Sequence, residues 1–123
     1  VTCGTKFKSE SEWRDLSKVK MNVGSSGSVL GFSRKDVFGS KQKTPSLDNE
    51  AQYRHIGAYG CVREALIEWA VAPRGVKERE EGLEQLRAMN LGLTMGAVIV
   101  PSDAGAVDTF GDVSRIEEKL AKL

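Results

Sequence analysis

The side chains best suited to covalent or metal chemistry are few, because the chain of 123 residues has only two cysteines, Cys3 and Cys61, and one histidine, His55. A cysteine nucleophile would need the histidine beside it, but in a helix positions 55 and 61 point about 120° apart after whole turns. Three such side chains also cannot supply the four ligands of a structural zinc site. We therefore predict no catalytic residue, no metal site and no cofactor, with His55 on a partly exposed helix surface.

Other residues that could bind phosphate or cations lack the required spacing. The glycines at positions 24–31 match neither the dinucleotide-binding pattern GxGxxG nor the Walker pattern GxxxxGK followed by Ser or Thr. The glutamates at 78–84 are typical of a solvated helix face, and the aspartates at 103–112 lack EF-hand spacing. No motif supports an enzyme, so we predict a non-catalytic protein.

Charge is distributed unevenly along the chain, although the net charge is only +1. Residues 1–45 carry nine basic and four acidic side chains, a net charge of +5, whereas residues 46–123 carry nine basic and thirteen acidic ones, a net charge of −4. Lysine and arginine attract phosphate groups, so the first segment is expected to contact nucleic acid or an anionic membrane surface. The residues predicted to do so are Lys6, Lys8, Lys18, Lys20, Arg34, Lys35, Lys41 and Lys43. The alternative is that these residues only keep the surface soluble.

Aromatic residues lie among these basic ones, as in platforms that stack on single-stranded nucleic acid. Phe7 stands between two lysines and is the candidate for stacking. Trp13 and Phe32 also have basic neighbours, but large aromatic residues are usually mostly buried, so we expect both in the core.

The first 45 residues are expected to be rich in strands. Ser9 and Glu12 have capping-box spacing, which predicts a short helix over 10–17. From residue 18 to 23 apolar and polar residues alternate, which indicates a half-buried strand with Lys18 and Lys20 on its outer face. The Gly and Ser residues that follow predict a β-hairpin with its turn near positions 25–26.

A long central helix is predicted over about 48–72, because Ile56, Tyr59, Val62, Leu66 and Trp69 recur at three- and four-residue steps. Ser46 or Asp48 is its candidate N-cap, and Pro73 ends it. A second helix over about 75–89 would pack against it as an antiparallel helical hairpin. If Leu66 is core, Leu66→Ala should cost about 2–5 kcal/mol.

The last third is expected to contain an internal strand over 91–100 and a terminal helix from Asp112 with an apolar stripe. This stripe and the small residues of the long helix could also form a face for a second copy of the chain, so we expect a homo-oligomer. The residues of this association face would be Gly57, Gly60, Cys61, Ile116 and Leu120.

Together these patterns predict a single α+β domain over 1–123, with a basic, β-rich part (1–45) and a helical, acidic part (46–123). Its small antiparallel or mixed sheet would pack with three to four helices. No apolar window is long enough to cross a bilayer, and the scarcity of cysteine favours an intracellular protein, cytoplasmic or virion-associated.

The predicted function is non-catalytic binding and self-assembly. A basic, Ser/Gly-rich leading segment on a compact body is a layout that viral coat, matrix and nucleocapsid proteins often share. Two alternatives stay open. One is a protein-interaction domain that does not bind nucleic acid, and the other is an enzyme subunit without a recognisable motif.

Overall fold

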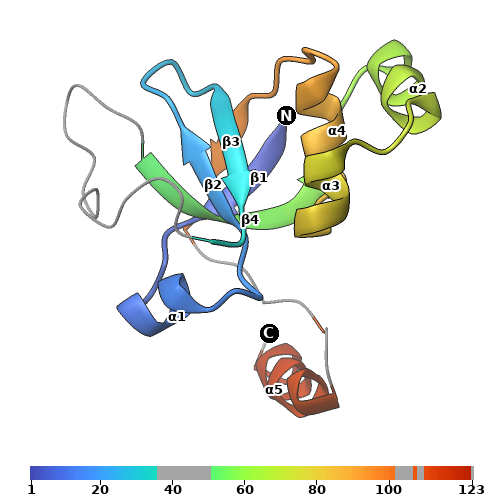
Figure 1. Ribbon diagram of the computed structural model, residues 1–123. Coiled ribbons are helices and arrows are strands. Elements are labelled where there is room, and N and C mark those ends of the chain that lie inside the picture. The colour runs from blue at the N-terminus through green and yellow to red at the C-terminus, as the bar shows by residue number, and fades with distance from the viewer. Residues whose placement is uncertain (36–50, 102–106, 108–109, 123) are drawn as a thin grey trace.

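A computed structural model describes residues 1–35, 51–101, 107 and 110–122, and its centre is a five-stranded mixed sheet (Figure 1). The strand order is β3-β2-β4-β1-β5. The strands are β1 (Thr2–Thr5), β2 (Lys20–Val23), β3 (Val29–Ser33), β4 (Ala51–Tyr59) and β5 (Ala97–Ile99). Neighbouring strands run antiparallel except β5, which pairs in parallel with β1.

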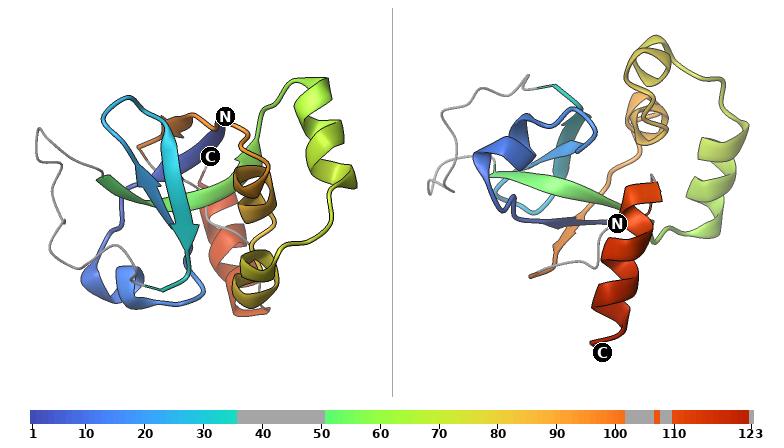
Figure 2. Two further views of the ribbon diagram at one scale, coloured as in Figure 1. Left: turned by 45° about the horizontal axis from the view of Figure 1, so that its top comes forward. Right: turned by 90° about the horizontal axis from the view of Figure 1, so that it is seen from below.

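The described residues also form the helices α1 (Glu10–Arg14), α2 (Arg63–Val71), α3 (Val76–Glu81), α4 (Gln85–Asn90) and α5 (Phe110–Leu120). Helices α3 and α4 lie beside the sheet, whereas α2 stands on their far side, away from it (Figures 1 and 2). Helix α5 stands apart from the sheet at one end of the molecule (Figures 1 and 2).

The short helix and the hairpin predicted in the first segment are present, but α1 ends at Arg14 rather than at residue 17, and β2 is buried along its whole length rather than half-buried. Ser9 caps α1, because its hydroxyl accepts a hydrogen bond from the Glu12 amide at 3.1 Å. Strands β2 and β3 form the predicted antiparallel hairpin, and Gly27 in its turn has φ of 80°, a conformation that glycine adopts without strain.

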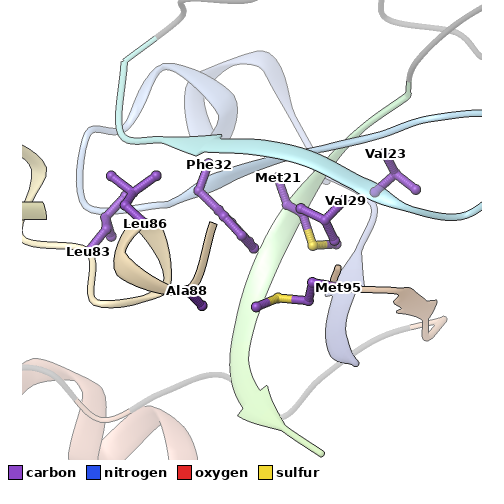
Figure 3. Packing of buried hydrophobic residues seen from close by; sticks show 8 residues of the cluster. All are labelled: Met21, Val23, Val29, Phe32, Leu83, Leu86, Ala88 and Met95. Atoms are coloured by element: carbon purple, nitrogen blue, oxygen red, sulfur yellow. The ribbon is translucent and has the colours of Figure 1, made fainter. Parts of the chain in front are cut away.

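The core lies between this hairpin and the segment that contains α4 (Figure 3). The hairpin contributes Met21, Val23, Val29 and Phe32, and the later segment contributes Leu83, Leu86, Ala88 and Met95. The prediction that Phe32 is core is confirmed. Trp13 is only half-buried, and its indole Nε1 donates to Gln52 Oε1 at 2.8 Å.

The predicted fold class was wrong in its main helical feature, the long helix over 48–72. Within the described part of that range, residues 51–59 are strand β4, at the centre of the sheet between β2 and β1, and only 63–71 are helical. The three-residue step from Ile56 to Tyr59 therefore joins opposite faces of a strand. Pairing with two neighbouring strands, which no local pattern reveals, decides the conformation of this segment. The candidate caps Ser46 and Asp48 lie outside the described residues.

The predicted helix over 75–89 is also wrong, because it is divided into α3 and α4 by Gly82, which has φ of 63°. A left-handed residue ends a helix, and the Gly82 amide donates to the Glu78 carbonyl at 2.9 Å, as in a C-terminal cap. No helical hairpin forms, and Leu66 on α2 is 50% exposed rather than core.

The end of the chain agrees in part with the sequence. The predicted strand over 91–100 shrinks to β5, which lies at the edge of the sheet rather than inside it. The terminal helix is present, beginning at Phe110, and no residue of it is buried.

Candidate functional site

An open pocket of about 580 Å³ brings together residues from distant parts of the chain. Strand β4 contributes Arg54, His55, Gly57 and Tyr59, and the link between α3 and α4, with the first residue of α4, contributes residues 82–85. The remaining lining comes from the first 35 residues and from α5, and consists of Lys8, Glu12, Ser17, Lys18, Val19, Arg34, Asp112, Arg115 and Lys119. The volume lies within the range typical of small-molecule sites, about 300–1,000 Å³.

His55 lies at the wall of this pocket and is held from several sides. Its Nε2 lies 2.8 Å from the Thr2 hydroxyl on the neighbouring strand β1. The Phe32 and Tyr59 rings flank the imidazole, with ring centroids 4.9 and 5.6 Å away. Burial lowers the pKa of His55 to about 4, although Glu84 opposes this shift, so the imidazole is neutral at pH 7.

One polar side chain of the pocket has a buried atom with no hydrogen-bond partner among the described residues. This atom is Gln85 Oε1, and Gln85 is only 2% exposed. Burial, with the charge of the Glu84 carboxylate and a hydrogen bond to it, raises the pKa of Tyr59, so this phenol keeps its proton. Buried polar groups are nearly always paired in proteins, so an unpaired acceptor in this pocket points to a ligand that donates a hydrogen bond, such as a hydroxyl group.

The charges around the pocket favour an anionic ligand. Six basic side chains line it against three acidic ones, Glu12, Glu84 and Asp112. Some of the basic groups are already held by the protein: Arg54 Nε forms an ion pair with Glu12 at 3.0 Å, and Arg34 Nε donates to the Glu81 carbonyl at 2.8 Å. Fixed cations that exceed the anions give the cavity a positive potential, which attracts a carboxylate or phosphate.

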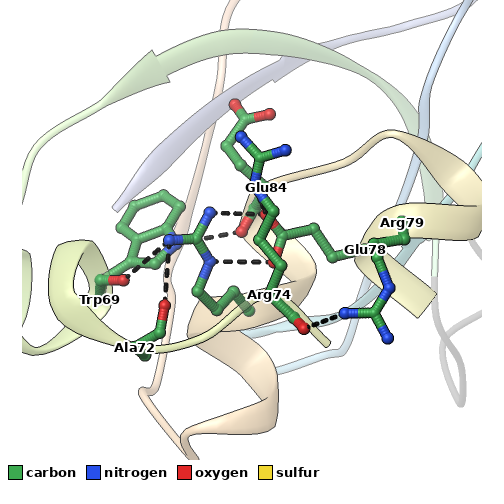
Figure 4. A network of polar contacts seen from close by, with 7 residues as sticks. Trp69, Ala72, Arg74, Glu78, Arg79 and Glu84 are labelled. Carbon is green, nitrogen blue, oxygen red and sulfur yellow. Dashed lines mark hydrogen bonds and ion pairs between the residues drawn. The ribbon is translucent and has the colours of Figure 1, made fainter. Parts of the chain in front are cut away.

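A network of polar contacts fixes the segment that carries Glu84 and Gln85 (Figure 4). Arg87 forms two hydrogen bonds with the Glu78 carboxylate, at 2.6 and 2.9 Å, and a third with the Trp69 carbonyl at 3.3 Å. The Trp69 indole in turn donates to the Glu84 carbonyl at 3.0 Å. It also packs edge-on against the Tyr59 ring, with the two ring centroids 5.2 Å apart. The network therefore connects α2 with both walls of the pocket.

Three of the basic residues predicted to bind an anionic partner, Lys8, Lys18 and Arg34, line this pocket. Lys6 and Lys35 are exposed, and Lys41 and Lys43 lie outside the described residues.

The prediction that Lys20 lies on an outer, basic face is wrong. Lys20 is 1% exposed, and it lies on an inner strand, where it pairs with Arg54 on β4 and with Ser33 on β3. Its ammonium donates to three backbone carbonyls, those of Asp15 at 2.9 Å, Lys18 at 3.0 Å and Arg34 at 2.8 Å. The charge is thus used to join chain segments.

The residues assigned to stacking and self-association are not brought together by the structure. Phe7 is half-buried. Gly57 lines the pocket, Gly60 and Cys61 are exposed beyond the end of β4, and Ile116 and Leu120 lie on α5.

Sequence reasoning missed His55, Tyr59 and Gln85 as site residues. His55, Gly57 and Tyr59 are spaced by two and all line the pocket, which is the pattern of one face of a strand. This alternation could have identified the face, but it was read as helical. Gln85 had no such signal, since it is buried at the start of α4, a helix that contacts α3 and strand β3.

Comparison with known proteins shows that this chain is similar to parts of enzymes. The chain is 35% identical over 111 residues to 3-deoxy-manno-octulosonate cytidylyltransferase of Desulfatibacillum aliphaticivorans, a match that covers 90% of this chain and 44% of the relative. It is also 35% identical over 122 residues to 8-amino-3,8-dideoxy-manno-octulosonate cytidylyltransferase of Shewanella loihica, covering 98% of this chain and 48% of that one. The chain thus spans about half the length of the relatives it matches. No family model matches it.

A solved structure gives the same indication. The structure of CMP:2-keto-3-deoxy-manno-octonic acid synthetase complexed with CTP superposes with a TM-score of 0.83 and 28% identity. The match covers 98% of this chain and 48% of the other. This chain therefore has the fold of the corresponding half of that synthetase, with its mixed sheet and without a helical hairpin.

These findings contradict the predicted function. The relatives are enzymes by name, so the expectation of a non-catalytic, nucleic-acid-binding or viral structural protein is wrong. The alternative of an enzyme subunit without a recognisable motif agrees better. A virion-associated location finds no support in these bacterial relatives. No helix among the described residues is long and apolar enough to cross a membrane, and within the same residues no group of three metal-ligating side chains is found.

Proposed function

We propose that this chain supplies the sugar-acid-binding part of a cytidylyltransferase that acts on 3-deoxy-manno-octulosonate or a close analogue. A transfer of this kind joins a sugar hydroxyl to the α-phosphorus of CTP and releases pyrophosphate. The names of the relatives supply the reaction and the class of substrate. The features of the pocket supply the reason for placing the sugar acid there.

The observation that carries this proposal is the buried Gln85 Oε1, which has no hydrogen-bond partner among the described residues and lies with Tyr59 and Glu84 in a pocket with excess positive charge. A polyhydroxylated acid matches this arrangement because its hydroxyls both donate and accept, and its carboxylate suits a basic surround. The neutral imidazole of His55 adds a further polar group that can contact a hydroxyl without competing for the negative charge.

Binding of 3-deoxy-manno-octulosonate to the 123-residue chain, measured by calorimetry, tests the proposal directly. Tyr59→Phe is expected to weaken binding about tenfold, or about 1.4 kcal/mol, because it removes one buried hydroxyl. Tyr53→Phe is the matched control, since Tyr53 lies on the same strand but does not line the pocket. Its affinity should equal that of the unmodified chain.

A neutral polyol such as sorbitol tests the requirement for the carboxylate and is expected to bind much more weakly than the acid. Equal affinities for acid and polyol, or equal losses in the two tyrosine variants, would contradict the proposal. Binding is the appropriate measurement because the enzyme activity in the relatives' names belongs to full-length proteins, and this chain spans only about half of their length.

Two earlier expectations stay predictions within this proposal. An intracellular location is consistent with an enzyme that consumes CTP. Self-association is to be tested by measuring the particle size over a concentration series, and a strictly monomeric chain would contradict it.

A further inference from the structure

Thr2 lies in an unusual position opposite the pocket strand. The register of β1 and β4 pairs Cys3 with Ile56 but Thr2 with Tyr59, so the pairing shifts between Thr2 and Cys3. A bulge of this kind re-aims side chains and carbonyls. Thr2 is 1% exposed, and its hydroxyl contacts both His55 Nε2, at 2.8 Å, and the Ala58 carbonyl, at 2.9 Å.

The two contacts of this hydroxyl determine where the imidazole proton lies. A carbonyl oxygen can only accept, so the single hydroxyl proton of Thr2 is donated to Ala58. The contact with His55 must then be donated by the ring, as Nε2–H to the threonine oxygen. A neutral imidazole carries one proton, so Nδ1 of His55 is left unprotonated and can accept a hydrogen bond.

The second ring nitrogen is available for a ligand. Among the described residues no side chain or backbone group donates to Nδ1, and Nδ1 is not one of the buried polar atoms that lack a partner. It is therefore partly accessible, on a side chain that lines the pocket. The depressed pKa of His55 keeps the ring neutral at pH 7, so Nδ1 retains its lone pair.

We propose that Thr2 is a positioning residue that locks His55 in its Nε2–H tautomer, so that Nδ1 accepts a hydrogen bond from a hydroxyl group of the bound ligand. The tautomer follows from the contacts alone. The identity of the ligand, a sugar acid, rests on the proposed function.

The tautomer can be measured without ambiguity because His55 is the only histidine of the chain. In protein labelled with ¹⁵N-histidine, two-bond and three-bond proton–nitrogen correlations distinguish a protonated from an unprotonated ring nitrogen. The unmodified chain at pH 7 is expected to show a protonated Nε2 and an unprotonated Nδ1. A protonated Nδ1 in this spectrum would overturn the proposal, and this result needs no variant to fold.

Substitution of Thr2 tests the cause of the tautomer. Thr2→Val keeps the shape of the side chain and removes the hydroxyl, so the proton is expected to distribute between both nitrogens, and Thr2→Ser should restore the single tautomer. Thr5→Val is the matched control, because Thr5 is equally buried in the same strand but lies opposite Arg54. If the tautomer is unchanged in a folded Thr2→Val chain, or lost in Thr2→Ser, Thr2 does not hold it.

Addition of 3-deoxy-manno-octulosonate tests the acceptor role. The Nδ1 resonance is expected to move on binding, and Thr2→Val should weaken binding about fivefold while Thr5→Val leaves it unchanged. Binding without any change at Nδ1 would overturn the acceptor role but not the proposed function. Absence of binding would overturn the proposed function, and the tautomer of the free chain would still confirm or refute the role of Thr2.

Discussion

The buried ammonium of Lys20 offers the sharpest test of the structure, because the same side chain was expected on the surface. Lys20→Met preserves the length and the apolar stem and removes the donors to the Asp15, Lys18 and Arg34 carbonyls. Hydrogen bonds to a charged group contribute about 1.5–3 kcal/mol each, so three give about 4.5–9 kcal/mol. The methionine variant no longer has the desolvation cost of a buried ammonium, which offsets several kcal/mol of this loss. In the variant, the Asp15 carbonyl still accepts a hydrogen bond from the Lys18 amide at 3.1 Å, so it is not left without a partner.

The net expectation is a loss of about 3 kcal/mol in the free energy of unfolding, which corresponds to a shift of about 2 M in the urea midpoint. The matched control is Lys18→Met, two residues away on a half-exposed side chain, which should change stability by less than about 0.5 kcal/mol. Urea unfolding followed by circular dichroism measures both variants. Equal effects of the two substitutions, or a loss below about 1 kcal/mol for Lys20→Met, would refute the structural role of this lysine.

Further predictions concern the core, the pocket and the break between α3 and α4. Leu86→Ala should cost about 2–5 kcal/mol because Leu86 is 8% exposed, whereas Leu66→Ala should cost less than about 1 kcal/mol; equal losses in urea unfolding would contradict this placement of the core. Since folding lowers the pKa of His55 from 6.5 to about 4, the unfolded chain binds the extra proton and stability should fall as the pH drops from 6.5 to 4. We expect about 1–2 kcal/mol for this part-buried ring, and a His55→Gln chain with the same pH slope would refute its origin. Gly82→Ala should cost about 1 kcal/mol because φ is 63°, whereas Gly57→Ala, with open space around it and no positive φ, should be nearly neutral; thermal unfolding compares the two.

The parts of the fold that the sequence predicted are those in which the deciding interactions are local. Ser9 caps α1 with an amide three residues away, and the turn around Gly27 joins two strands that are adjacent in sequence. The prediction for the segment that forms strand β4 was wrong because the interactions that decide its structure are not local. Its partners β1 and β2 lie about 30–50 residues away, and an apolar step from Ile56 to Tyr59 fits a helix as well as two faces of a strand.

The site was less predictable than the fold because its members come from separate elements. Gln85 is polar and stands in a run of charged residues, so nothing in its neighbourhood predicts that it is 2% exposed. Likewise, a lone histidine has no recognisable chemistry until Thr2, more than 50 residues earlier, is placed 2.8 Å from its ring. Those contacts are properties of strand register, and register is set by the whole sheet.

The charge split of the first segment had a physical basis, but a count of charges cannot separate the tasks that individual cations perform. Lys8, Lys18 and Arg34 line the pocket, where a positive potential can act on a ligand. The Lys20 ammonium instead donates hydrogen bonds to three backbone carbonyls of the protein. These tasks are coupled, since two of those carbonyls belong to Lys18 and Arg34 themselves. Loss of the Lys20 ammonium should therefore displace the pocket cations as well as destabilise the chain, so Lys20→Met should weaken sugar-acid binding under conditions in which the variant is still folded.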